Sequence, residues 1–257
     1  MKKAFFQLLV LTGAALLAPA TFLAQSPDTT VSKEKQYKNV IRYNLSGPLL
    51  FGFDKHVVFG FERLIGKQQS ISVNFGKTAF PKLITFESDS FSLTRDAKNN
   101  GTNFSIDWRF YLAKENKFQP PHGLYIGPYY SFSGYKRTNE FNVKRVSGTT
   151  DILTSNVKFN IHTIGAEMGY QFVLWKRLTL DMVLIGPGIS SYEITAKFDG
   201  NLNDADKEKL RDAVQQIITQ KFPGMNYVMG DKELNADGFL DTWSWGYRYL
   251  IHIGFLF

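Results

Sequence analysis

Every second residue of the last fifteen, positions 243–257, is aromatic or aliphatic, without a single polar interruption. These residues are Trp243, Trp245, Tyr247, Tyr249, Ile251, Ile253, Phe255 and Phe257. The positions between them are small, charged or mixed. Because a β-strand directs successive side chains to opposite faces, the segment predicts a strand with one wholly apolar face. A tilted strand of about 9–11 residues suffices to cross a bilayer, so this one is long enough to do so.

Seven further segments share this alternation and predict strands. They span residues 39–51, 56–64, 70–77, 103–112, 123–135, 159–172 and 178–189. The links at 65–68, 114–122 and 174–177 are short, whereas those at 78–102, 136–158 and 193–242 are long; the short link at 52–55 is the exception. Short turns on one rim and long loops on the other are typical of a transmembrane barrel. The expected fold class is therefore all-β: an eight-stranded antiparallel up-and-down transmembrane β-barrel over residues 39–257.

Two of these segments carry an irregularity. Pro128 lies inside the segment 123–135 and has no N–H to donate to a neighbouring strand, which predicts a local bulge. In the segment 159–172 the apolar positions change parity near Thr163, and a bulge would explain this change as well.

The composition favours membrane strands over membrane helices. Aromatic residues make up 15% of the chain, yet the mean hydropathy is −0.19. After the N-terminus, no segment offers the roughly 18 consecutive apolar residues of a membrane helix. The chain has no Cys, which excludes disulfides, thiol nucleophiles and a lipid-modified N-terminal Cys. The net charge of +7 is spread along the chain, so no nucleic-acid partner is expected.

The first 24 residues predict a secretory signal peptide. Lys2 and Lys3 form its charged region, residues 4–17 form its apolar core, and cleavage is expected after Ala20 or after Ala24. Residues 25–38, rich in Ser, Thr, Lys and Gln, predict a flexible lead-in to the barrel.

The C-terminal segment resembles the last strand of outer-membrane β-barrel proteins of Gram-negative bacteria, and the whole barrel region resembles the small OmpA/OmpX-type barrels in architecture. The residues that carry the resemblance, and match the family's terminal assembly signal, are Tyr249, Ile251, Ile253, Phe255 and Phe257. The resemblance implies localisation in the cell outer membrane and recognition by the barrel-assembly machinery. It also implies contact with outer-membrane lipid and lipopolysaccharide.

The other faces of the predicted strands are rich in Gly, Ser, Asn and Tyr and carry isolated charges of both signs. These charges are Arg42, Glu62, Asp107, Arg109, Glu167, Asp181 and Arg248. Buried charges are tolerated only when they are paired, and an eight-stranded barrel has just enough interior to hold its own side chains. The pattern predicts a salt-bridge network that plugs the lumen. A gated proton or ion path is the alternative for the same charges.

The last long link, 193–242, contains a helical pattern over residues 204–222 that ends at Pro223 and Gly224. The apolar stripe of this extracellular helix either packs as a lid on the barrel mouth or on neighbouring loops, or it docks an extracellular partner or lipid head groups. Residues 231–238 resemble a calcium loop faintly, but the Glu that such a loop needs at its twelfth position is missing. A polar turn is favoured, and no metal or cofactor is expected.

No catalytic motif is present, so no catalytic residue is assigned; His162 with Ser155 and Asp151 is the only combination that could act as a base, nucleophile and acid. We expect a non-enzymatic outer-membrane protein that acts in envelope integrity, adhesion or partner binding through its long loops. Two alternatives remain open at this point. One is a lipid A- or phospholipid-modifying barrel enzyme, and the other is a secreted soluble barrel, turned inside out, that binds a hydrophobic ligand.

Overall fold

The computed structural model of the chain describes residues 37–79, 91–144, 150–199, 208, 212, 215 and 238–257. Apart from the three single positions 208, 212 and 215, the described residues are ten strands, one short helix and their links. In chain order the elements are β1 (Asn39–Asn44), α2 (Ser46–Phe51), β2 (Val57–Leu64), β3 (Gln69–Thr78), β4 (Phe91–Tyr111), β5 (Gly123–Lys144), β6 (Thr150–Leu174), β7 (Leu178–Ile185), β8 (Pro187–Asp199), β9 (Phe239–Tyr247) and β10 (Leu250–Leu256). The expected signal peptide and most of the lead-in lie outside the described residues.

Eight of the strands close a barrel, as the alternation in the sequence predicts. Consecutive strands from β1 to β7 pair with one another, and β10 pairs with both β7 and β1. Every pair is antiparallel, and the backbone of Asn39 exchanges hydrogen bonds of 3.0 and 2.8 Å with that of Phe257. The all-β, closed, eight-stranded antiparallel barrel is therefore confirmed.

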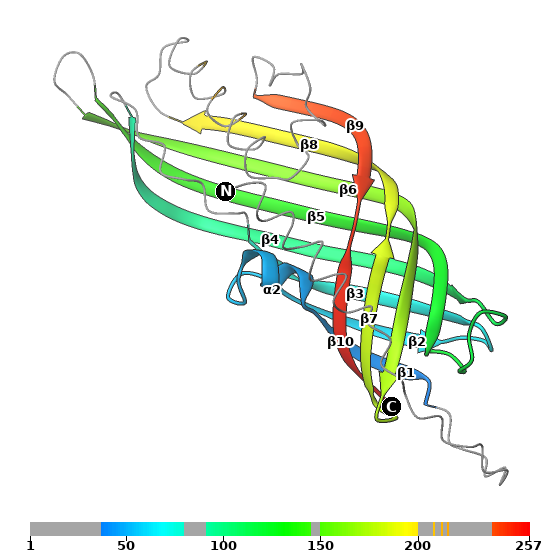
Figure 1. Cartoon of the computed structure of the whole chain (residues 1–257). Coiled ribbons are helices and arrows are strands. Elements are labelled where there is room, and N and C mark those ends of the chain that lie inside the picture. The colour runs from blue at the N-terminus through cyan, green and yellow to red at the C-terminus, as the bar shows by residue number, and fades with distance from the viewer. Residues whose placement is uncertain are drawn as a thin grey trace, which may run out of the picture. The chain divides into compact units, whose positions relative to one another are not determined.

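The barrel wall is much taller on one side than on the other. Strand β8 follows β7 beyond Gly186 and pairs with the first half of β6, and β9 pairs with β8 before it leads into β10. Strands β4, β5 and β6 are 21, 22 and 25 residues long, whereas β1 has 6 residues. The result is a five-stranded sheet of β4, β5, β6, β8 and β9 that projects beyond the closed barrel, as Figure 1 shows.

The first predicted strand, 39–51, is wrong in its second half. β1 ends at Asn44, and the helix α2 follows it directly. Leu45 already has helical backbone angles (φ −93°, ψ −21°), and Pro48 in the first turn needs no hydrogen-bond donor there. Leu49 and Leu50, read from the sequence as part of a strand, are exposed residues of this helix.

Two of the predicted long loops, 78–102 and 136–158, are wrong over most of their described length. β4 begins at Phe91, and β5 and β6 continue the hairpin as far as the pair Lys144↔Thr150. The outward side chains here include the exposed Lys136 and Lys158, so the apolar face used to recognise strands is lost. Backbone pairing across the hairpin does not need that face, and the strands therefore run on.

The expected bulges near Thr163 and at Pro128 are wrong. The pairing of β5 with both neighbours keeps one register across Pro128, and β6 keeps one register with β5 along its whole length. What changes along β6 is the kind of side chain that points inward: Val157 and Phe159 above, Thr163 and Glu167 below. The register shift of β6 lies further on, at Met168 and Gly169, where its partner is β7.

The C-terminal strand predicted over 243–257 is divided. β9 ends at Tyr247 and β10 begins at Leu250, while the backbone N–H of Arg248 donates to the carbonyl of Gly186 at 2.9 Å. Gly186 also separates β7 from β8, so both strands are interrupted at the same height. The helix expected over 204–222 lies outside the described residues except for Glu208, Asp212 and Gln215, which are helical, and it stays a prediction.

Closure of the barrel by β1 and β10 can be tested with a disulfide, because the natural chain has no Cys. Val40 faces Leu256 across these strands, next to the hydrogen-bonded pair Asn39↔Phe257. Such a non-hydrogen-bonded pair has Cα atoms about 4.5 Å apart, within the range that a disulfide spans. We expect Val40→Cys/Leu256→Cys to oxidise to a bridge, seen as a mobility shift in non-reducing gels. The pair Val40→Cys/Leu240→Cys is the control that should stay reduced.

Candidate functional site

The side chains of the barrel are distributed in the reverse of the usual order for a soluble domain. Arg42 and Arg109 are 1% and 0% exposed, whereas Phe75 and Phe59 are 63% and 58% exposed. Charged and polar groups therefore fill the inside of the barrel, and large apolar side chains cover its outside.

All seven charges expected in the lumen point into the interior of the barrel. Arg42 lies on β1, Glu62 on β2, Asp107 and Arg109 on β4, Glu167 on β6 and Asp181 on β7, and Arg248 lies between β9 and β10. Glycines make room for the largest of them. A Cβ atom at Gly60 would come within 2.9 Å of the Arg42 side chain, and one at Gly254 within 3.0 Å.

Arg42 and Arg109 lie at the centre of this group, the lumen charge network. Arg42 Nη1 is 2.8 Å from an Asp181 carboxylate oxygen and 3.5 Å from one of Glu62. Arg109 Nη1 is 3.0 Å from Asp181, and Arg109 Nε is 3.4 Å from Glu167. Arg248 completes the network by donating to both Asp107 and Glu167. Three guanidinium groups thus face four carboxylates, and each carboxylate contacts at least two of the three arginines.

Neutral side chains that were not predicted as site residues add hydrogen bonds to the network. The Tyr111 hydroxyl donates to Glu62 at 2.8 Å, and the Tyr125 hydroxyl donates to Asp181 at 2.7 Å. The guanidinium carbon of Arg109 lies 4.3 Å from the centre of the Tyr125 ring, which adds a cation–π contact. His252 Nδ1 is 3.3 Å from Asp181.

A signal for these neutral residues was present in the sequence. Tyr111 is two residues after Arg109, and His252 is four residues after Arg248, so each has the strand parity of a predicted inward charge. The parity alone would have placed them in the interior.

Above the charge network, the interior becomes apolar. Phe159, Tyr192, Ile194 and Leu240 pack together on the inner side of the projecting sheet with Val157 and Ala196. Phe159 and Ile194 are fully buried. The inner surface of β6 thus passes from apolar to charged along a single strand.

The residues expected to form the assembly signal point outward from β10 and its two flanks. Tyr249, Ile251, Ile253, Phe255 and Phe257 are all exposed. β10 is held between β7 and β1 by its backbone, so these side chains contribute to the apolar outer surface.

The combination of His162, Ser155 and Asp151 does not form a site. His162 points outward, where its Nδ1 lies 2.9 Å from the Tyr130 hydroxyl, while Ser155 on the same strand is buried inside. Groups on opposite faces of one strand do not reach each other, and the Asp151 side chain lies outside the described residues.

The segment 231–238, read as a polar turn rather than a calcium loop, also lies outside the described residues except for Gly238. In the part of the chain that is described, no cluster of His, Asp and Glu has the grouping of a metal site, and no helix is both long and apolar enough to cross a bilayer.

Two solved structures resemble the chain distantly in their backbone trace. A major outer membrane protein from Thermus thermophilus superposes with a TM-score of 0.36 and 8% sequence identity, over 86% of this chain and 98% of that one. Acinetobacter baumannii CarO2 superposes with a TM-score of 0.34 and 10% identity, over the same shares of the two chains. No protein-family model matches the sequence, and no curated protein matches it.

Breaking the lumen charge network should destabilise the barrel strongly. Arg109→Met leaves Asp181 and Glu167 with fewer cationic partners, and removing one partner of a buried pair costs about 3–5 kcal/mol. The double variant Arg109→Met/Asp181→Asn should recover part of this loss, because it also removes one of the four carboxylates that two arginines would otherwise have to compensate. Urea unfolding in detergent micelles measures both effects. The exposed Arg63→Met is the control, expected within about 0.5 kcal/mol of the wild type. An equal loss of stability in Arg63→Met and Arg109→Met would contradict the stabilising role of the lumen charge network.

Proposed function

We propose that this protein is an outer-membrane β-barrel whose bore is closed by its own charges and whose function is non-enzymatic. The observation that carries the proposal is the reversal of faces, with buried arginines inside the barrel and exposed aromatic side chains outside it. The resemblance of the C-terminal strand to assembly signals supports the outer membrane as its location. On this proposal, its partners include outer-membrane lipid, lipopolysaccharide and the barrel-assembly machinery.

The apolar outer surface supports a location in hydrocarbon. On the strands of the closed barrel the outward side chains form a continuous series that includes Phe59 and Phe61 on β2, Val73 and Phe75 on β3, and Ile253 on β10, all of them exposed. Soluble monomers rarely expose apolar patches beyond a few hundred Å². A band of this kind around a barrel with a polar interior is what a transmembrane barrel presents to lipid.

The lumen charge network supports a closed bore. An eight-stranded barrel has little interior space beyond that of its own side chains. Arg42, Arg109 and Arg248 reach across this space from three positions around the wall, and Tyr111 and Tyr125 fill its lower part. Opening a path for ions would separate these charges from their partners, which is costly in a medium of low dielectric constant.

The projecting sheet supports a role at the cell surface. Five strands extend beyond the closed barrel, at the end opposite to the short turns and to Phe257 (Figure 1). Adhesion, envelope integrity and binding of an extracellular partner through this sheet and the 193–242 connection are the roles that fit such a projection. The lipid-modifying alternative lacks its nominated site, because His162 and Ser155 lie on opposite faces of β6.

Membrane insertion is tested by refolding the purified barrel into phospholipid vesicles. We expect it to float with the vesicles and to resist removal by carbonate at high pH. In SDS gels, unboiled protein should run apart from boiled protein, because a closed barrel unfolds in SDS only on heating. Phe75→Asp places a charge on the lipid-facing surface and should reduce the inserted fraction. A freely soluble protein with no gel shift would contradict the proposal and favour a soluble, ligand-binding barrel.

Closure of the bore is tested by conductance in planar bilayers. We expect the wild type to give no stable current steps, because its charges fill the lumen. Long-lived current steps from the wild type, abolished by neutralising Arg42 or Arg109, would instead support an ion path through the network.

A further inference from the structure

The short turns of the barrel lie together on one rim, called here the short-turn rim. It consists of residues 37–38, 63–68, 112–122, 175–177 and 257. The strand register and the contacts between links bring these segments to one end: Leu64 N–H donates to Lys38 O, Tyr111 N–H to Gln68 O, and Leu256 N–H to Arg177 O. The distribution of charge on this rim is unequal.

Basic side chains dominate the short-turn rim. Seven of them are exposed on it: Lys38, Arg63, Lys67, Lys114, Lys117, Lys176 and Arg177. Among the described residues of this rim, Glu115 carries the one exposed acidic side chain. Burial against neighbouring rings lowers the pKa of His122, so this side chain adds no charge at neutral pH.

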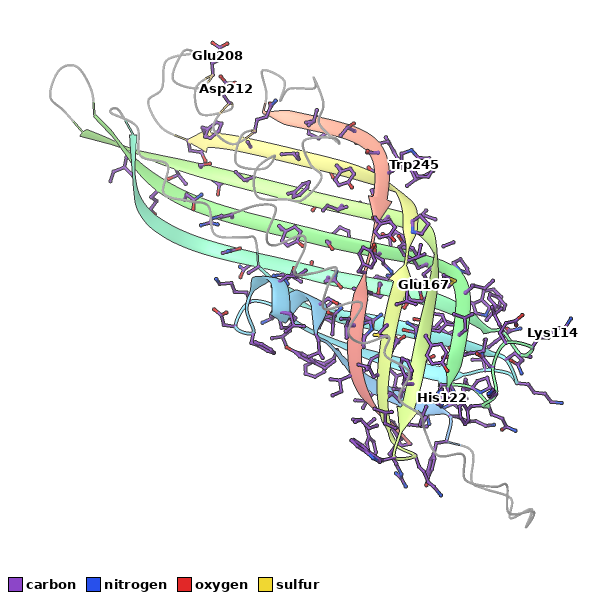
Figure 2. The ribbon with its side chains drawn as sticks, viewed as in Figure 1. Lys114, His122, Glu167, Glu208, Asp212 and Trp245 are labelled. Atoms are coloured by element: carbon purple, nitrogen blue, oxygen red, sulfur yellow. The ribbon has the colours of Figure 1, made fainter. Side chains whose placement is uncertain are left out.

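The opposite end of the molecule carries no such excess among its described residues. Its exposed charges include Lys77, Lys136 and Lys158, but also acids such as Glu208 and Asp212. Figure 2 shows Lys114 and His122 at one end of the barrel and Glu208 and Asp212 at the other. Among the described residues, the excess of exposed positive charge is therefore concentrated on the short-turn rim.

Exposed apolar side chains lie on the same turns as the basic ones. Ile65, Phe118 and Trp175 are 51%, 59% and 85% exposed. The Arg177 guanidinium stacks over the Tyr37 ring at 4.3 Å and lies 5.5 Å from the ring of the lipid-facing Phe255. Aromatic rings that alternate with long basic side chains are typical of the boundary between lipid tails and head groups, where the rings enter the membrane and the cations remain at its surface.

We propose that the short-turn rim binds the phosphate groups of anionic phospholipids in the membrane leaflet that surrounds it. This inference rests on the proposed function, since the rim meets a leaflet only if the barrel spans a membrane. The apolar outer band ends at this rim, so Lys67, Lys114 and Lys117 are held at the depth of the head groups. The adjoining apolar side chains favour a lipid over a soluble polyanion, which would leave Trp175 and Phe118 in water.

The test compares how strongly two brominated lipids quench the fluorescence of Trp175. The protein is refolded into vesicles that contain either dibrominated phosphatidylglycerol or dibrominated phosphatidylcholine, and the signal of a Trp175→Phe variant is subtracted to remove the other tryptophans. At low salt, we expect quenching by the phosphatidylglycerol to exceed quenching by the phosphatidylcholine about fivefold. Each basic residue near an anionic lipid surface contributes on the order of 1 kcal/mol, which corresponds to about that ratio. In about 1 M salt the preference should disappear, since charges are then screened within about 3 Å.

Two triple variants separate this rim from general electrostatics. Lys67→Gln/Lys114→Gln/Lys117→Gln should lower the preference to roughly half of the wild-type ratio or below. The matched control, Lys77→Gln/Lys136→Gln/Lys158→Gln, removes the same charge at the other end and should leave the ratio unchanged. If the protein inserts but the two lipids quench equally, or if the two triple variants have equal effects, this inference is wrong while the proposed function stands. Failure to insert into either vesicle would overturn the proposed function, and this inference with it.

Discussion

The pairing of charges inside the barrel is the interaction on which the rest of the structure depends. Each buried ion loses several kcal/mol of hydration, and only close opposite charges and hydrogen bonds compensate for that loss. Arg42 and Arg109 meet this requirement by contacting four carboxylates from different strands. Because these partners come from β1, β2, β4, β6 and β7, the network forms only when the barrel has closed.

The outer surface follows from the same closure. A closed ring of antiparallel strands satisfies its backbone hydrogen bonds internally, so its outside can be entirely apolar without leaving polar groups unpaired. Phe75 and Ile253 are exposed for this reason, and not because the fold failed to bury them. Three layers of chemistry then follow one another along the barrel axis: a basic rim with aromatic side chains, an apolar band around a charged bore, and a projecting sheet with an apolar inner face.

Particular residues show where sequence reasoning succeeded and where it failed. The inward parity of Asp107, Arg109 and Glu167 followed from period-2 alternation, because each of these strands has one largely apolar face in the barrel region. The same criterion missed the strand extensions around Lys136 and Lys158, since the outward side chains there are no longer uniformly apolar. It also misread α2 as part of a strand, because a short apolar run such as Leu49 and Leu50 fits the end of a strand as well as a single helical turn.

The sequence by itself determined the number of barrel strands, their direction and the face on which each charge lies, because these properties depend on local alternation and on the length of the links. The tertiary structure alone decided which charges meet. The contact between Arg42 and Asp181 spans 139 positions of the chain, and no local pattern encodes the register that brings β1, β10 and β7 together. It also decided that the short turns form a single basic rim, since residues so far apart in sequence become neighbours only when the barrel closes.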